Sequence, residues 1–147
     1  MSDQYGYVYM EYNTTSKEKA ITLENNSEYF DIQKGSPCII TLSGFTTIYP
    51  SWQLIQNGEI IGTAKFNLTL ADNQQLIVSS YPENQYARVY NPDKTFADVS
   101  QLEDFSKDNY LRVPSGVSTL LAYVDSTTDV SVTFKEERAL LSIIIKV

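Results

Sequence analysis

Acidic side chains are the residues of this chain whose type and spacing best suit acid–base chemistry. Asp98, Glu103, Asp104 and Asp108 follow one another in a polar stretch. A glycosidase needs two such carboxyl groups roughly 5 to 10 Å apart. None of the four belongs to a recognisable catalytic pattern, and acidic side chains are usually exposed. We therefore interpret them, together with Glu136–Glu137, as solvated charges and predict a protein that is not an enzyme, with a carboxylate-based glycosidase as the less favoured reading.

The absence of histidine excludes further types of catalytic and metal site. No histidine occurs among the 147 residues, which excludes Ser-His-Asp and Cys-His catalysis and nearly every zinc site of known ligand pattern. The glycine-rich patterns that bind phosphate, G-x-x-x-x-G-K-[ST] and G-x-G-x-x-G, do not occur either. The sequence predicts no cofactor.

A thiol and a pair of aspartates remain as possible reactive or metal-binding groups. Cys38 is the only cysteine and is followed by Ile39-Ile40, which is typical of a buried and unreactive thiol. Asp125 and Asp129 could bracket a calcium ion, but the Ser-Thr-Thr between them lacks the ligand spacing of an EF-hand loop. We interpret this segment as the tip of a hairpin and predict no metal site.

Aromatic residues are the one compositional excess, with 11 Tyr, 6 Phe and 1 Trp. Exposed tyrosines provide an apolar ring and a polar hydroxyl, which suits sugar stacking or a protein interface. Tyr81, Tyr86 and Tyr90 flank turn-rich segments and form the predicted interaction surface. Trp52 lies in a strand-like segment and is predicted to belong to the core.

Charge and hydropathy limit the partners. Eighteen acidic and eleven basic residues give a net charge of −7, which disfavours nucleic acid because binding phosphates requires clustered Lys and Arg. No stretch approaches the roughly 20 apolar residues of a membrane helix, and Met1–Gln4 lacks the features of a signal peptide. We expect a soluble protein that is synthesised in the cytoplasm and does not bind membranes.

Short antiparallel strands are the elements predicted to position these residues. Asn57-Gly58 separates two apolar-rich arms, 52–56 and 59–61. Both central residues of a type I′ turn need positive φ, which Asn and Gly tolerate best, so this segment predicts a hairpin. Strict alternation over 65–70, followed by turn residues at 72–73, predicts that the hairpin continues into a meander.

Similar patterns recur along the chain and predict about ten strands. They fall at 5–12, 38–43, 75–79, 86–90, 110–113, 117–125, 130–134 and 138–147, with weaker signals at 21–23 and 29–32. Ser100–Glu103 has the S-x-x-E form of a helix capping box and predicts at most one helical turn. Regularly spaced strands with almost no helix predict one all-β domain over 1–147, an antiparallel two-sheet β-sandwich.

A series of segments resembles a known family. In chain order they are GSPCIITLSG (35–44), PSWQLIQNG (50–58), FNLTL (66–70), LIV (76–78), LRVPSGVSTL (111–120) and VSVTFKEER (130–138). Together they resemble the C-terminal domain of the siphophage distal tail protein family over residues 30–141. Residues 1–29 would then be an N-terminal strand and a turn-rich lead-in.

The resemblance implies a galectin-like, jelly-roll-like sandwich in a bacteriophage baseplate, and hence a location at the tail tip of the virion. Members of that family form a hexameric ring and hold other tail or receptor-binding proteins. The ring is built mainly by a preceding domain, so a hexamer is expected here only if the chain is part of a longer protein. The His-Asn-Arg-Trp set with which galectins bind sugar is missing. The tyrosine excess still leaves a carbohydrate-binding module for host-surface glycans as the alternative function.

Overall fold

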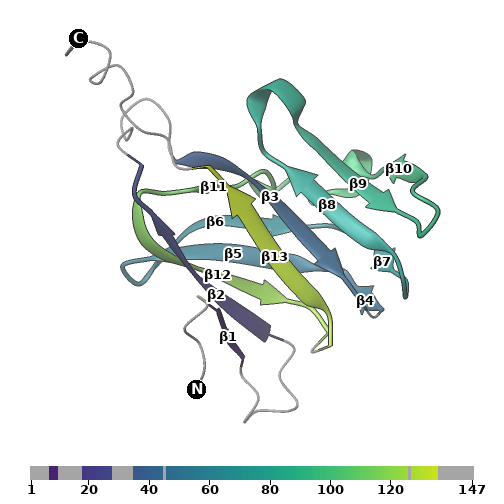
Figure 1. Ribbon diagram of the computed structural model, residues 1–147, viewed down its shortest axis with the longest axis horizontal. Coiled ribbons are helices and arrows are strands. Elements are labelled where there is room, and N and C mark those ends of the chain that lie inside the picture. Colours follow the sequence, from purple (N-terminus) through teal and green to yellow (C-terminus); the bar gives the residue numbers. More distant parts are fainter. Residues whose placement is uncertain (1–6, 10–17, 28–34, 45, 126, 136–147) are drawn as a thin grey trace.

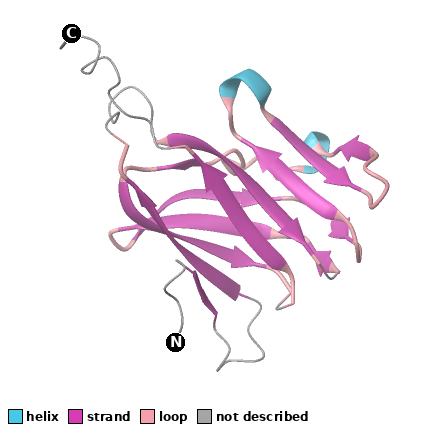
Figure 2. Cartoon of the chain, in the orientation of Figure 1, coloured by secondary structure: helices cyan, strands magenta, loops and turns pink. Residues whose placement is uncertain are grey.

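The chain folds into two antiparallel β-sheets that pack face to face (Figure 1). The computed structural model describes residues 7–9, 18–27, 35–44, 46–125 and 127–135. Figure 2 shows that strands dominate these residues and that the helical parts are two short 3₁₀ turns. The predicted all-β, two-sheet sandwich is therefore confirmed.

The first sheet has five strands in the order β1-β2-β12-β5-β6. Their bounds are β1 (Tyr7–Tyr9), β2 (Glu18–Asn25), β12 (Gly116–Tyr123), β5 (Ser51–Gln56) and β6 (Glu59–Lys65). All neighbouring strands are antiparallel. Strands distant in the sequence are thus adjacent in the sheet, because β12 lies between β2 and β5.

The second sheet has six strands. Its bounds are β10 (Phe96–Asp98), β9 (Tyr86–Tyr90), β8 (Gln75–Ser79), β3 (Ser36–Ser43), β11 (Arg112–Val113) and β13 (Asp129–Phe134). The first five follow one another in the sheet, and β13 also pairs with β3. A separate small pair joins β4 (Thr47–Ile48) to β7 (Thr69–Leu70).

One cluster of buried apolar side chains fills the space between the sheets. Alternate residues of strands such as β3, β5 and β12 are buried, as expected for a sheet with one covered face. On β3 the inward residues are Cys38, Ile40 and Leu42. Trp52 of β5 is also buried and stacks on Phe66, with ring centroids 5.7 Å apart. The predicted core positions of Cys38 and Trp52 are confirmed.

The β5–β6 hairpin has the predicted turn. Asn57 and Gly58 both have positive φ, 54° and 80°, as a type I′ turn requires. The pairing shifts between Leu54 and Ile55, which leaves Ile61 of β6 without a partner and forms a bulge. The hairpin prediction is confirmed, and β6 extends beyond the predicted arm to Lys65.

Buried polar side chains tie the two sheets together at their ends. The Asn25 side chain, at the end of β2, donates to the Ser36 hydroxyl at 3.0 Å and to the Val113 carbonyl at 2.9 Å. At another point Thr128 is fully buried, hydrogen-bonds the Thr47 hydroxyl at 2.7 Å and accepts from Lys19 Nζ through its carbonyl. Burial lowers the pKa of Lys19, against the opposing charges of Asp129 and Asp125.

The loop before β11 covers the outer edge of β6. The Thr63 N–H donates to the Asp108 carboxylate and its carbonyl accepts from Asn109 N–H. Lys65 N–H donates to the Asn109 side chain at 3.0 Å, and its carbonyl accepts from Asp104 N–H at 2.9 Å. Unpaired strand edges invite pairing with other chains, so this loop blocks part of one such edge.

Two predictions about connectivity are wrong. Residues 52–79 do not form a meander, because the β5–β6 hairpin belongs to one sheet and β8 to the other. Residues 125–129 are not a hairpin tip, because β12 and β13 also lie in different sheets. In both places the turn residues are predicted correctly. The chain, however, crosses to the other sheet instead of returning beside the preceding strand.

The predicted helical turn is present, but its cap and several strand bounds need correction. Ser100 begins the turn η3 (Ser100–Leu102) instead of capping it, and its N–H donates to Asp98 Oδ1 at 2.8 Å. A second turn, η2 (Pro82–Asn84), was not predicted. The strand expected at 65–70 is divided between β6 and β7, although its alternating burial is confirmed.

Other strand predictions have mixed outcomes. The weak signal at 21–23 corresponds to the eight-residue strand β2, and only Tyr7–Tyr9 of the predicted strand 5–12 are described. The strands predicted at 29–32 and 138–147, and Glu136–Glu137, lie outside the described residues. Within the described part, no helix has the length and apolar character needed to span a bilayer.

Two glycines with positive φ provide a matched test of the packing. A Cβ on Gly35 would lie 2.6 Å from the Val113 carbonyl oxygen, whereas one on Gly58 would meet no atom within 4 Å. Gly58→Ala should lower the free energy of unfolding by about 1 to 2 kcal/mol through backbone strain alone. Gly35→Ala should lower the free energy of unfolding by about 1 to 3 kcal/mol more than Gly58→Ala does, because it adds a steric clash. Urea unfolding measures both, and equal losses would contradict the assigned clash.

Candidate functional site

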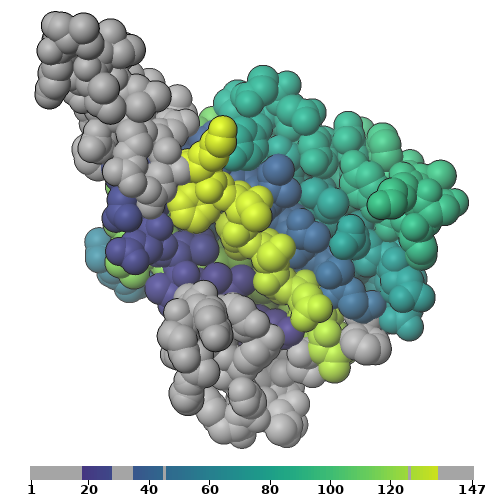
Figure 3. All heavy atoms as spheres, in the orientation of Figure 1, coloured from purple at the N-terminus to yellow at the C-terminus, as the bar shows by residue number. Residues whose placement is uncertain are grey.

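The outward face of the second sheet carries the candidate site. On β9 the side chains alternate, so that Ala87 and Val89 pack in the core while Tyr86, Arg88 and Tyr90 lie on the opposite face. In Figure 3 the face formed by β3, β8 and β9 is open to the viewer. Residues on this face are therefore available for contacts without disturbing the core.

Four side chains of β9 and β10 form a cluster, which we call the aromatic–arginine cluster: Tyr86, Arg88, Tyr90 and Phe96. The Arg88 guanidinium lies 4.0 Å from the ring centroid of Tyr86 and 4.4 Å from that of Phe96. It also donates to the Tyr90 hydroxyl at 3.1 Å. The ring centroids of Tyr90 and Phe96 are 5.1 Å apart, and Phe96 is 50% exposed. The guanidinium is attracted to the faces of both rings, so the four side chains form a packed, partly exposed platform.

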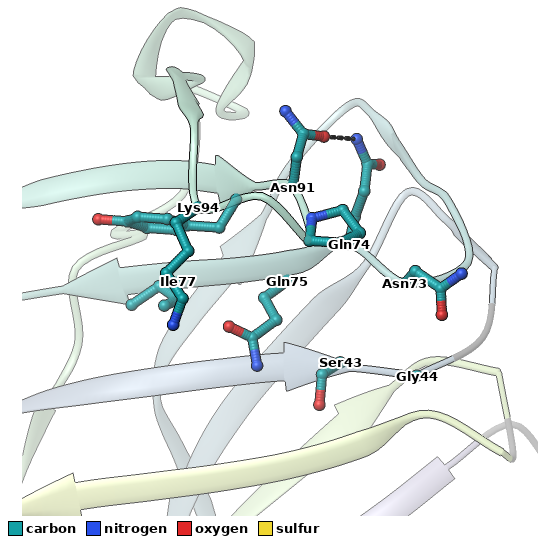
Figure 4. Close-up of a pocket in the computed structure, with 10 residues that line it drawn as sticks. Ser43, Gly44, Asn73, Gln74, Gln75, Ile77, Asn91 and Lys94 are labelled. Carbon is teal, nitrogen blue, oxygen red and sulfur yellow. Dashed lines mark hydrogen bonds between the residues drawn. The ribbon is translucent and has the colours of Figure 1, made fainter.

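Next to this cluster lies a groove of about 590 Å³. It is formed by the ends of β3, β8 and β9 and by the turns that follow β3, precede β8 and follow β9 (Figure 4). The lining residues are Ser43, Gly44, Asn73, Gln74, Gln75, Ile77, Tyr90, Asn91, Pro92 and Lys94. Tyr90 belongs to both features and joins the platform to the groove.

Hydrogen bonds fix the walls of the groove. Gln74 donates to the side-chain oxygen of Asn91 at 2.9 Å across the two turns, as the dashed line in Figure 4 shows. The Gln74 oxygen accepts from Ala71 N–H, and the Asn91 amide donates to the Thr95 hydroxyl. These two amides are thus engaged in structure, and they hold neighbouring turns at a fixed separation.

The predicted interaction surface is only partly assembled. The structure brings Tyr86 and Tyr90 together on one face of β9, two positions on either side of Arg88. Tyr81 is half-buried at the start of η2, its N–H donates to the Ser79 hydroxyl, and it does not belong to the cluster. Arg88 could have been found from the period-two pattern, whereas Phe96 joins only through the pairing of β10 with β9.

The acidic residues considered for catalysis have structural partners. Asp104 Oδ1 accepts from the hydroxyl and N–H of Ser106 at 2.6 and 3.0 Å, and these bonds lower the pKa of Asp104. The bond from Ser100 N–H likewise lowers the pKa of Asp98. A general acid needs a raised pKa, so these two carboxyl groups are shifted in the wrong direction for that role.

Glu103 and Asp108 are engaged in the loop that covers β6. Glu103 accepts from the Asn109 amide and from the Tyr110 hydroxyl, each at 3.1 Å. Burial raises the pKa of Tyr110, and the negative charge of Glu103 adds to the effect. Asp108 accepts from Thr63 N–H at 3.1 Å. Asp108 therefore holds the loop against β6, whereas Glu103 ties two residues of the loop to each other.

Asp125, one of the two aspartates considered for calcium, also acts locally. Asp125 Oδ1 accepts from the N–H and hydroxyl of Thr127, at 3.0 and 2.6 Å, which is an Asx turn. Across the residues that the structure describes, no three His, Cys, Asp or Glu side chains gather so as to hold a metal ion.

Comparisons of this chain with protein-family models, with curated proteins and with solved structures gave no match.

The Cys38 thiol should be unreactive in the folded protein. Its side chain is 2% exposed and its Sγ lies 3.3 Å from the Leu111 carbonyl. Burial raises the pKa of the thiol from 9.0 to about 11, against the opposing effects of Ser80 and Arg112. At pH 8 we expect a disulfide reagent to label Cys38 only as fast as the protein opens, and much faster in urea. Rapid labelling without denaturant would contradict the buried position.

The same shift predicts a pH dependence of stability. Between pH 9 and about 11 the folded state keeps the thiol proton that the unfolded state has lost. The contribution of Cys38 to the free energy of unfolding is therefore complete below pH 9 and falls as the pH rises through that window. Urea unfolding of the wild type and of Cys38→Ala across pH 8 to 11 measures it, because the variant lacks the thiol that titrates.

The aromatic–arginine cluster should show energetic coupling. In a double-mutant cycle, the double variant Arg88→Ala/Phe96→Ala should lose less free energy of unfolding than the two single variants lose in sum. We expect the difference to be about 0.5 to 1 kcal/mol. Phe105, an exposed phenylalanine outside the cluster, provides the control, since Arg88→Ala and Phe105→Ala should be additive. Additivity of the Arg88–Phe96 pair in urea unfolding would mean that the stacking contributes nothing to stability.

Proposed function

We propose that this chain is a non-enzymatic structural module of a bacteriophage tail tip, which holds or projects other baseplate or receptor-binding components through protein contacts. The observation that carries the proposal is the order of segments resembling the distal tail protein family. Those segments coincide with structural elements: 35–44 covers β3 and its closing glycine, and 50–58 covers β5 and the hairpin turn. A β-sandwich is also the fold that the resemblance implies.

The local roles of the acidic residues support a function without catalysis. Asp98 and Asp104 organise tight turns, Glu103 bonds a residue of its own loop, and Asp108 holds that loop against β6. Carboxylates with such partners are already engaged in maintaining the fold. A module that acts by presenting surfaces requires this kind of rigid loop, because ordered loops reduce the entropy lost on binding.

Exposed apolar residues near the β5–β6 hairpin offer a surface for protein contacts. Ile60 and Val117 are 59% and 60% exposed, and Ile61 is 45% exposed. Ile60 pairs with Ile55, and Ile55 pairs with Thr119, two positions from Val117. Clustered exposed apolar side chains commonly mark interaction sites. We call Ile55, Ile60, Ile61 and Val117 the hairpin surface and assign the protein contacts of the tail module to it.

The location at a tail tip can be tested on particles of the phage that encodes this chain. We expect purified virions to contain the chain, and gold-labelled antibody to mark one end of the tail. Detection of the chain only in the lysate, or label along the tail tube or on the head, would contradict the proposal.

The hairpin surface can be tested in the same particles. Ile60→Lys with Val117→Lys should remove the chain from virions by placing charges in an apolar contact. Thr133→Lys is the matched control, because Thr133 is exposed on β13 of the other sheet, and it should leave incorporation unchanged. Unchanged incorporation of the double variant would exclude the hairpin surface from the assembly.

A further inference from the structure

The groove on the second sheet continues a row of paired residues that crosses four strands. Phe96 pairs with Tyr90, Tyr90 with Gln75, and Gln75 with Ser43. Paired residues lie on the same face of a sheet, so the row passes from two aromatic rings to an amide and then to a hydroxyl. From Tyr90 to Ser43 it spans about 10 Å at the usual strand separation. An extended ligand could therefore lie across the strands along this row.

Several polar side chains of the groove are free to bind a ligand. Among the described residues, Ser43, Asn73 and Gln75 have no hydrogen-bond partner for their side chains, in contrast to the engaged pair Gln74 and Asn91. A hydroxyl and two primary amides can each donate and accept. In Figure 4 Ser43 and Gln75 extend from adjacent strands and Asn73 from the neighbouring turn. These three groups thus form an uncharged set of donors and acceptors on a fixed frame.

Sugar hydroxyls match this set of groups. Each hydroxyl of a pyranose ring donates and accepts, as amides do, and the C–H face of the ring packs on an aromatic side chain. Tyr90 is half-buried, and its position is fixed by Phe96 and by the bond from Arg88. We propose that this groove binds a short neutral oligosaccharide, which contacts Tyr90 with the apolar face of one ring and bonds Ser43, Asn73 and Gln75 with its hydroxyls.

The local charges favour a neutral ligand over a polyanion. Among the described residues that line the groove, Lys94 is the only cation. Acidic residues adjoin the groove, since Asp129 pairs with Ser43 and Asp93 lies in the same turn as Lys94. With a net charge of −7 on the whole chain, a ligand with many phosphates or carboxylates would be repelled.

Two substitutions remove the proposed contacts without disturbing the fold. Asn73 has positive φ, so Asn73→Gly removes the amide and suits the backbone. Asn57→Gly is its matched control, because Asn57 also has positive φ but lies in the β5–β6 turn. Gln75→Ala removes the second amide, and Gln101→Ala, in the exposed turn η3, is the matched control for it. Urea unfolding should confirm that all four variants remain folded.

Binding is measured on a printed array of neutral oligosaccharides and then by calorimetric titration of the best-bound compound. We expect saturable binding that weakens about fivefold in Asn73→Gly and in Gln75→Ala, the loss of one hydrogen bond each. Asn57→Gly and Gln101→Ala should bind like the wild type. The inference does not depend on the tail location, which is tested separately on virions.

Three results would overturn the inference. The first is an array without saturable binding, and the second is binding that the groove variants leave unchanged, since the sugar would then lie elsewhere. The third is a groove that takes a protein instead. In that case Asn73→Gly and Gln75→Ala would abolish incorporation of the chain into virions while no oligosaccharide bound.

Discussion

The fold depends on the alternation of side chains along each strand. Two sheets can share one dry core only if every second residue is apolar, and the remaining residues must then face outward. On β3 this places Cys38, Ile40 and Leu42 inside, and on β9 it places Ala87 inside. The same rule puts Tyr86, Arg88 and Tyr90 on one outward face. The surface available for function is therefore fixed by the demands of the core.

Alternation of side chains does not by itself fix how the two sheets are joined. Buried polar contacts between the sheets do this. Asn25 reaches from the first sheet to Ser36 and Val113 of the second, and Thr128 bonds Thr47 where the chain crosses between sheets. Buried amides and hydroxyls are costly when unpaired, so such contacts allow few alternative arrangements of the sheets. The outer groove is joined to this frame through β3, which carries Ser36 at one end and Ser43 of the groove at the other.

The sequence predicts features set by neighbouring residues better than those set by distant ones. The Asn57-Gly58 turn and the alternation of β9 were predictable, because each depends on local backbone preference and period. The place of β12 and β13 in different sheets was not, since a turn sequence does not say which sheet the next strand joins. For the same reason Tyr86 and Tyr90 were predicted, but the stacking of Phe96 and the groove required the pairing of β8, β9 and β10.

The two proposed surfaces differ in chemistry as well as in position. The hairpin surface lies on the first sheet and exposes branched apolar side chains, which gain most from being covered permanently by protein. The groove lies on the second sheet and exposes amides and a hydroxyl, which suit exchangeable bonds with a hydrated ligand. Since the core separates the sheets, occupation of one surface leaves the other open. A module fixed through its first sheet could therefore present its second sheet to a glycan-covered cell surface.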